Sequence, residues 1–391
     1  MIAARRTTLR RRLHLALACG LTLSAGLLGC QAPGSASPAD CNQAISARHM
    51  QRFGNADLPR RIGTVENVGL QLPAVSPDGH QLLYLRTDQD ALSPLTLLGA
   101  ADPQATPPSG TLEVWIRPID GATAGRCLST ERWAHSATWS PTGGAVAYVA
   151  CEPPESYIVH VDLQTGRTTR LGVPGSINCL PSFDGGDGTL LFCVGTSSAG
   201  PFRVFRQSVG DAHPEALSPD GADCVLPVAS DGGGAVLCAQ VEGQHLNWVR
   251  SSTAGQTVVA PEWGASARPD LLQVWAGIAA PLSPDRRAVL YYDTTRERIS
   301  ILHVPDRLVR WHRRGSIAAC WIDNETIALA TPDGAFVVNT GTGASVSLFS
   351  GQWIPVRYVP AEQRLILLGQ DTRRRFAIWQ VDFNPQVGVK P

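Results

Sequence analysis

The sequence of 391 residues has little charge and no excess of either sign. Lys and Arg total 33, Asp and Glu total 33, and together they make up 17% of the chain. Proteins that hold nucleic acid through its phosphates need a surplus of basic residues. The balance therefore gives no support to a nucleic-acid partner.

The residue patterns of common catalytic and metal sites are also missing. The chain has no C-x-x-C pair and no Cys/His cluster with zinc spacing. It has no H-E-x-x-H helix motif and no G-x-S-x-G nucleophile elbow. From the sequence we predict no metal, no cofactor and no catalytic residue.

An extended apolar run occurs at the N-terminus, from Leu13 to Leu28. Five arginines precede it, and a small residue and a cysteine, Gly29 and Cys30, follow it. A charged segment, an apolar segment and a small residue before the cleavage point are typical of a secretory signal. The run is short for a bilayer span of about 20 residues and contains polar positions, so a transmembrane helix is the weaker interpretation.

The residues Leu27-Leu28-Gly29-Cys30 resemble the lipobox of bacterial lipoproteins. That resemblance implies cleavage before Cys30, a diacylglycerol on its thiol and acylation of the new amine, so the partner at this end would be a membrane. Gln31 in place of Asp implies an outer-membrane location, facing the periplasm or the cell surface. Residues 4–10 also loosely resemble a twin-arginine signal, so the export route stays open between the general and the twin-arginine systems.

Cleavage would leave 28 basic and 33 acidic residues, because residues 1–29 hold five arginines and no acid. The next residues, 31–40, are rich in Ala, Pro, Ser and Gly, which is the composition of a flexible tether. A short helix is expected around residues 43–53. We predict a signal peptide over 1–29, a lipidated tether over 30–60 and a folded domain over 61–391.

Eight cysteines remain once Cys19 leaves with the signal and Cys30 takes lipid, an even number that suits up to four disulfides in an oxidising compartment. Cys179 and Cys193 share a spacing of 14 with Cys224 and Cys238. An antiparallel hairpin centred between the members of each pair would place them opposite each other, within disulfide reach. We predict Cys179–Cys193 and Cys224–Cys238. Closeness in sequence suggests Cys127–Cys151, and no partner is assigned to Cys41 or Cys320.

The folded domain contains an internal repeat. Ser-Pro-Asp-Gly or a close variant follows an apolar residue at 75, 139 and 282, and each copy leads into an alternating strand. Weaker copies start at 183, 228, 321 and 358, which makes the separations 64, 44, 45, 54, 39 and 37 residues. Periods near 40 with short strands indicate propeller blades, and single sheets of this kind must stack to bury both faces.

These units resemble the TolB-type, WD-like propeller repeat over about residues 70–384. The resemblance implies an all-β fold, a single β-propeller of seven blades with four antiparallel strands each; six or eight blades remain alternatives. The last unit has three clear strands, so residues near 61–70 are expected to supply its outer strand and to close the ring.

Long loops carry the candidate binding surface. The longest insertions, about residues 87–110 and 261–277, join the second strand of a blade to the third and the fourth strand to the first of the next blade. Loops of these two kinds emerge on the same face of a propeller. Arg and Trp are enriched at binding hot spots, and the alternative is that they solvate the surface or cap the core. The candidate binding residues in such loops are Trp133, His135, Arg296, Arg313, Arg314, Trp353, Arg373 and Arg374.

Two functions compete on this evidence. The first is a membrane-anchored envelope lipoprotein whose propeller is a non-catalytic scaffold for a protein, peptide or glycan partner, since such folds often serve as platforms. The alternative is a periplasmic hydrolase or lyase with its site at the channel mouth, which converging carboxylates or histidines would favour.

Overall fold

The computed structural model describes residues 59–69, 71–88, 110–197, 200–230, 234–243, 245–265, 278, 280–293, 298–305, 307–351, 353–372 and 375–383. Chain contacts divide the protein into two compact units, Met1–Gln51 and Arg52–Pro391. The predicted signal peptide, Cys30, Cys41 and most of the predicted tether lie outside the described residues. Within these residues no helix has the length and apolarity needed to span a membrane.

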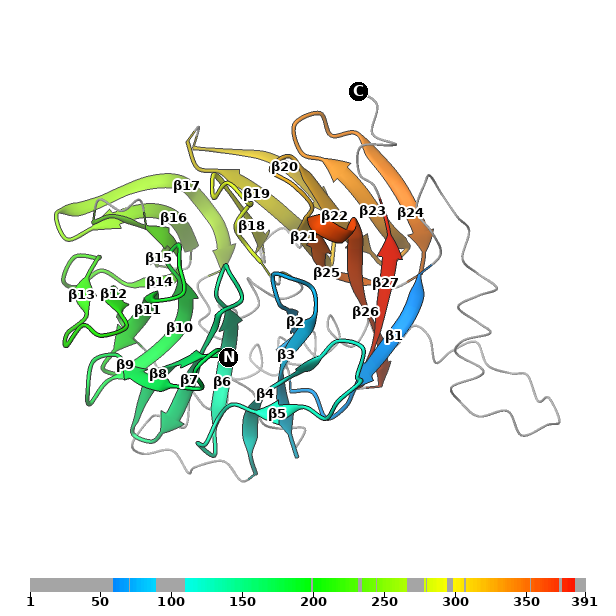
Figure 1. Ribbon diagram of the computed structural model, residues 1–391. Helices are drawn as coiled ribbons and strands as arrows, with labels where there is room; N and C mark the ends of the chain where they lie inside the picture. Colours follow the sequence, from blue (N-terminus) through cyan, green and yellow to red (C-terminus); the bar gives the residue numbers. More distant parts are fainter. Residues whose placement is uncertain are drawn as a thin grey trace, which may run out of the picture. The chain divides into compact units, whose positions relative to one another are not determined.

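The described strands form seven antiparallel sheets (Figure 1). Blade one consists of β2 (Ala74–Val75), β3 (Gln81–Thr87), β4 (Leu112–Pro118) and β5 (Arg126–Cys127). Blade two consists of β6 (Ala134–Trp139), β7 (Ala145–Glu152), β8 (Glu155–Asp162) and β9 (Thr168–Leu171). Blade three consists of β10 (Ile177–Phe183), β11 (Thr189–Gly195), β12 (Phe202–Ser208) and β13 (Glu215–Ala216). Blade four consists of β14 (Cys224–Ser230), β15 (Val236–Glu242), β16 (His245–Ser252) and β17 (Gly255–Ala265). Blade five consists of β18 (Ala288–Asp293), β19 (Arg298–His303) and β20 (Leu308–Arg314), and blade six of β21 (Ala318–Trp321), β22 (Thr326–Thr331), β23 (Gly334–Asn339) and β24 (Ser345–Ser350). Blade seven consists of β25 (Ile354–Val359), β26 (Arg364–Thr372), β27 (Arg375–Asp382) and β1 (Arg60–Val65).

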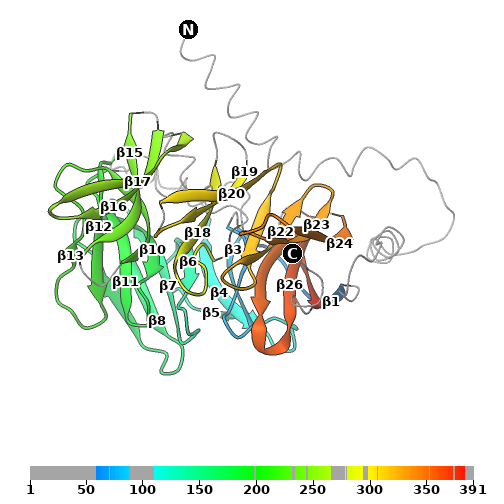
Figure 2. The same ribbon diagram turned by 90° about the horizontal axis from the view of Figure 1, so that it is seen from above.

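The ring closes as the sequence predicted. β1 pairs with β27, and the blue N-terminal strand lies beside the red C-terminal strands in Figure 1 and Figure 2. Blade five has three strands in the described residues, and its first strand is reduced to a bridge from Leu282 to Val289. The predicted all-β propeller with an N-terminal closing strand is confirmed.

The hydrophobic core lies between neighbouring blades rather than inside any one of them. One cluster joins blades one and two through Leu83, Val114 and Val146, and another joins blades seven and one through Val75 and Ile366. Each sheet has apolar side chains on both faces, so each face is removed from water only when the next blade covers it. The blades therefore depend on one another for stability.

The Ser-Pro-Asp-Gly repeat is a hydrogen-bonded turn between the first two strands of a blade. In blade one, the Ser76 hydroxyl donates to Asp78 Oδ1 over 2.5 Å, and Ser76 Oγ accepts from the backbone N–H of Gln81 over 2.9 Å. Gly79 takes a φ of 79°, which glycine adopts without strain. Burial raises the pKa of Asp78, but the hydrogen bonds from Ser76 and from the His80 N–H outweigh it, and the pKa is lowered.

The first strands of blades two, three and four share a bulge that breaks their register. Ser136, Leu180 and Leu226 occupy equivalent positions, with φ values of 51°, 53° and 53°. The pairing of β6 with β7, of β10 with β11 and of β14 with β15 shifts at these points. Bulges of this kind re-aim the side chains that follow them.

Candidate functional site

A pocket of about 550 Å³ lies at the seam where the ring closes, between blades seven and one. Its size falls within the range of about 300–1,000 Å³ that is usual for small-molecule sites. The pocket is formed by strand β1, the start of β26 and the end of β27. Blade one adds the turn before β3 and the turn after β4. Its lining residues are Arg60, Arg61, Ile62, His80, Pro118, Ile119, Asp120, Arg364 and Gln380.

Backbone pairing fixes the wall that β1 contributes. Arg60 lies opposite Gln380 on β27, and Arg61 lies opposite Trp379. On the other side of β1, Arg117 Nη1 donates to the Thr64 carbonyl over 2.9 Å. A side chain at Gly63 would begin 2.7 Å from the carbonyl oxygen of Ile119, so only glycine allows this approach. The closing strand is therefore held between the last blade and the first.

Blade one and blade seven also meet through an ionic cluster at the pocket. Glu362 has a nitrogen of blade seven and one of blade one beside its carboxylate: Arg364 Nη2 lies 2.6 Å from its Oε2, and His80 Nε2 lies 3.3 Å from its Oε1. Arg364 Nη1 donates to Gln380 Oε1 over 3.4 Å, whereas the buried Arg364 Nε has no hydrogen-bond partner. The Arg364 side chain is only 14% exposed, so its charge is poorly screened by water.

Cationic groups outnumber anionic ones here. Arg60, Arg61 and Arg364 supply three permanent charges, and Asp120 and Glu362 supply two opposite ones. Among the described residues at the pocket, arginines thus outnumber carboxylates.

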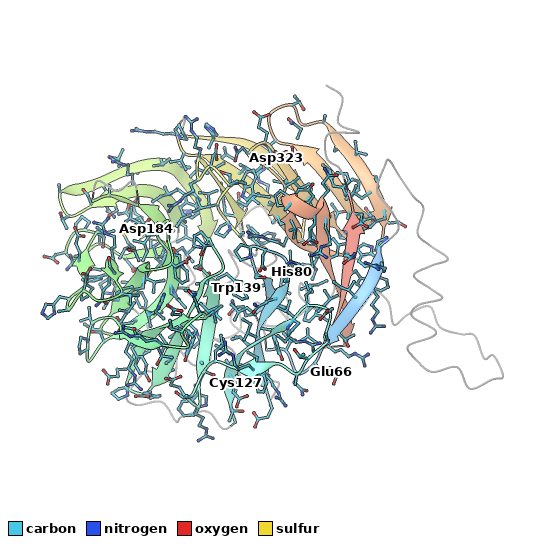
Figure 3. The ribbon with its side chains drawn as sticks, viewed as in Figure 1. Glu66, His80, Cys127, Trp139, Asp184 and Asp323 are labelled. Atoms are coloured by element: carbon cyan, nitrogen blue, oxygen red, sulfur yellow. The ribbon has the colours of Figure 1, made fainter. Side chains whose placement is uncertain are left out.

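The turns between the first and second strands link blades on the same face as His80. Arg286, at the glycine position of its turn with a φ of 61°, forms an ion pair of 3.2 Å with Asp184 of blade three. Asn324 Oδ1 of blade six accepts from the Asp285 N–H over 2.9 Å. Figure 3 places His80 and Trp139 toward the middle of the ring, and Glu66 and Cys127 toward its rim. No three His, Cys, Asp or Glu side chains converge as metal ligands among the described residues.

Three of the predicted binding residues are buried. Trp133 donates its Nε1–H to the Gly110 carbonyl over 3.1 Å, and Trp353 packs edge-on against Phe349 and Trp379. His135 is 1% exposed, and burial lowers its pKa to about 3. The prediction of loop-borne, exposed side chains is therefore wrong for these three, because each belongs to the packing between or within blades.

The predicted arginines give a different result. Arg313 and Arg314 belong to strand β20, opposite Ile299 and Arg298 of β19, and not to a loop. Arg296, Arg373 and Arg374 lie outside the described residues, as do most of the two long insertions. The structure thus leaves the predicted loop face as a hypothesis and adds the seam pocket, which the sequence interpretation missed.

The cysteines of blades three and four gather in one buried cluster. Cys179 and Cys193 lie directly opposite each other on β10 and β11, as the predicted hairpin requires. Cys224 lies opposite Gln240, not opposite Cys238, because the bulge at Leu226 shifts the register. The predicted register is therefore right for the first pair and wrong for the second.

The thiols of this cluster interact within blade four and affect one another electrostatically across blades three and four. The Cys238 thiol donates a hydrogen bond to Cys224, which lowers the pKa of Cys224 and raises that of Cys238. Burial raises the pKa of Cys193, and the nearby sulfurs of Cys179 and Cys224 add to this effect. Elsewhere, Cys127 on β5 donates to the Ser129 carbonyl, and Cys151 is buried on β7 of the next blade.

Comparison with known proteins identifies the fold. No protein-family model matches the sequence, and no curated protein sequence matches it. Among solved structures, an oligogalacturonate lyase from Vibrio parahaemolyticus is 11% identical, with 87% of this chain and 98% of that chain covered and a TM-score of 0.54. The β-propeller domain of Cps50 (Swd1) from Myceliophteria thermophila is 15% identical, with 82% and 99% covered and a TM-score of 0.51.

TolB from Acinetobacter baumannii is also similar, at 15% identity and a TM-score of 0.41, with 71% of this chain and 66% of that chain covered. The chain thus spans just under two thirds of the length of that protein. At these identities the two likenesses with a TM-score above 0.5 identify a β-propeller and leave the activity open, because one fold serves many functions.

Proposed function

We propose that the chain is a lipid-anchored envelope protein whose β-propeller is a non-catalytic scaffold that binds a protein, peptide or glycan partner. The anchor is the acylated Cys30, and the location is the outer membrane, facing the periplasm or the cell surface. Support for the anchor comes from the arginine-rich start, the apolar run and the Leu-Leu-Gly-Cys ending. Several acyl chains on one cysteine hold a protein on a membrane far more firmly than a single chain.

The seam pocket is the observation that carries the binding role. It combines a volume suited to a small ligand or a peptide end with apolar side chains and a few fixed polar groups. Its walls come from strands of two blades, so the fold holds the lining residues in place before a ligand arrives. A preformed site loses less conformational entropy on binding than a mobile loop does.

Two measurements test this proposal. Replacing Cys30 with Ser should move the protein from the membrane pellet to the soluble fraction and abolish labelling by palmitate. Capture from membranes with the lipidated protein should recover a partner that the Arg364→Gln variant does not retain, while the exposed Arg126→Gln variant in blade one retains it. Unchanged palmitate labelling, or equal recovery by Arg364→Gln, would contradict the anchor or the binding site respectively.

A hydrolase or lyase is the second candidate, and the His80–Glu362 contact of 3.3 Å favours it. A histidine oriented by a carboxylate beside arginines has the parts of a general base next to an anion-binding group. Turnover of an acidic oligosaccharide or a peptide that is lost in His80→Ala would support the enzyme. Binding of the same compound without turnover supports the scaffold.

We also propose the disulfides Cys179–Cys193 and Cys224–Cys238. Opposed positions across an antiparallel pair lie about 4.5–5.5 Å apart, which suits a disulfide. The first pair meets this condition in the observed register, and the second lies diagonally on one face with its thiols in hydrogen-bond contact. A Cys127–Cys151 pair would join blades one and two, and it rests on sequence proximity.

A further inference from the structure

We infer that the four cysteines of blades three and four form a buried redox site that moves a disulfide from one blade to the other. The route runs from Cys179–Cys193 to Cys224–Cys238 through an intermediate that links Cys193 to Cys224. The inference rests on the disulfides proposed above, and it goes beyond them by assigning an exchange reaction and a third disulfide between blades. Three observations carry it: the opposed first pair, the contact between blades at Cys193, and the hydrogen-bond donors around Cys224.

The four side chains belong to one apolar cluster shared by the two blades. Cys179 and Cys193 lie on β10 and β11, and Cys224 and Cys238 lie on β14 and β15. None of them is more than 2% exposed. A thiolate attacks a disulfide only where it can reach the sulfur, so burial favours exchange within the cluster over exchange with a thiol in solution.

The pair in blade three is placed to hold the disulfide first. Cys179 lies directly opposite Cys193 across β10 and β11, and opposed positions of an antiparallel pair suit disulfide geometry. Cys224 and Cys238 are offset, because Cys224 lies opposite Gln240. Blade three should therefore oxidise before blade four does, which leaves two thiols beside a disulfide.

Cys193 is the sulfur at which the two blades meet. Leu226, the bulge residue of β14, donates its backbone N–H to the Cys193 sulfur. Cys224 lies two positions before that bulge, and Cys193 is close enough to Cys224 and to Cys238 for their charges to interact. Of the two sulfurs in a blade-three disulfide, Cys193 is therefore the one that a thiolate of blade four should attack.

Cys224 is the attacking sulfur. Gln256 Nε2 donates to Cys224 Sγ over 2.9 Å, and the sulfur also accepts from the Cys238 thiol and the Ser251 hydroxyl. The hydrogen bond from Cys238, together with those from Ser251 and Gln256, lowers the pKa of Cys224 although burial opposes it. The thiolate is the nucleophile in thiol–disulfide exchange, so these donors prepare Cys224 for the first step.

The exchange consumes no outside oxidant. In the first step Cys224 Sγ attacks Cys193 Sγ, the bond between Cys179 and Cys193 breaks, and Cys179 leaves as a thiolate. In the second step Cys238 Sγ attacks Cys224 Sγ, and the Cys238 proton passes to Cys193 as that sulfur leaves. The same number of disulfides, protons and negative charges is present before and after. Because hydrogen bonds stabilise reduced Cys224, the disulfide should reside mainly in blade three.

Two double variants of the full-length protein in detergent test the route. Cys179→Ser/Cys238→Ser keeps the two central sulfurs, and oxidised glutathione should form Cys193–Cys224 in it. Cys193→Ser/Cys224→Ser keeps the two outer sulfurs as the matched control and should form no disulfide between them. Non-reducing peptide mapping after an acid quench measures both. The absence of Cys193–Cys224 from the first variant, or an equal yield of Cys179–Cys238 in the control, would overturn the inference.

The wild-type chain decides the matter if the first variant does not fold. In glutathione buffers that leave a single disulfide among these cysteines, quenched samples should contain Cys193–Cys224 beside Cys179–Cys193. Gln256→Leu removes a donor to Cys224 and should slow the appearance of Cys224–Cys238 by about threefold, since the loss of thiolate is partly offset by greater nucleophilicity. Gln164→Leu, at an exposed position of blade two, should exchange as the wild type does.

Equal rates in Gln256→Leu and the wild type would overturn the role of Cys224 as the attacking sulfur. Formation of both disulfides within the blades, with no Cys193–Cys224 link at any stage, would overturn the exchange and leave the proposed disulfides standing. Partner capture from membranes is measured separately, so failure here is distinguishable from failure of the scaffold function.

Discussion

His135 should make the protein unstable in mild acid. Its ring is buried at the start of β6, Nδ1 lies 2.9 Å from Ser136 Oγ, and burial lowers the pKa to about 3. In the unfolded chain the pKa of histidine is about 6.5. Because the folded value lies below the unfolded one, the unfolded chain takes up the proton first as the pH falls. Stability is therefore lost between about pH 6.5 and pH 3.

Linkage gives the size of the effect. Between pH 7 and pH 5 this one residue should lower the free energy of unfolding by about 2 kcal/mol. Urea unfolding at a series of pH values measures it. His135→Asn stays neutral throughout and should lose less stability over that interval by the same amount, whatever its stability at pH 7. His213→Asn, at an exposed position, should keep the wild-type dependence. Parallel pH profiles for wild type and His135→Asn would refute the reasoning.

Gly63→Ala should lower the melting temperature through a clash with the Ile119 carbonyl, at a cost of about 1–3 kcal/mol, while Gly186→Ala, which meets no atom within 4 Å, should not. Non-reducing peptide mapping should detect a disulfide between Cys179 and Cys193. A disulfide from either cysteine to another residue would contradict the observed register. Joint replacement of four arginines should leave the melting temperature within about 1 °C in a thermal-shift assay, and it should weaken the binding of any partner that uses these side chains; the four are Arg313 and Arg314 of β20, and Arg373 and Arg374.

The Ser-Pro-Asp-Gly repeat could be recognised in the sequence because the residues of each turn form hydrogen bonds with one another. Ser76, Asp78 and Gly79 form a turn whose hydrogen bonds are all local, so the motif means the same structure wherever it stands. The closing strand was also predictable, since a last blade with three strands leaves an edge that another strand must cover. Burial of Trp133 and Trp353 was not predictable, because a tryptophan in a loop segment can point either way until its neighbours are placed.

The pairing register of the cysteines could be predicted from their spacing for one hairpin and not for the other. Equal spacings in adjacent blades suggested one register for both pairs, and it holds for Cys179 and Cys193. It does not hold for Cys224, because the bulge at Leu226 takes up residues in β14 and moves Cys224 opposite Gln240. A bulge at a non-glycine residue leaves no clear mark in the sequence.

The repeating unit, its turns and the missing fourth strand of the last blade could all be read from residues that lie close together in the chain. The seam pocket depends on tertiary structure. Arg60 and Arg61 are separated by about 300 positions from Arg364, and only the pairing of β1 with β27 brings them together. A site assembled from the two ends of a chain has no spacing that a sequence pattern could reveal, since its geometry arises when the ring closes.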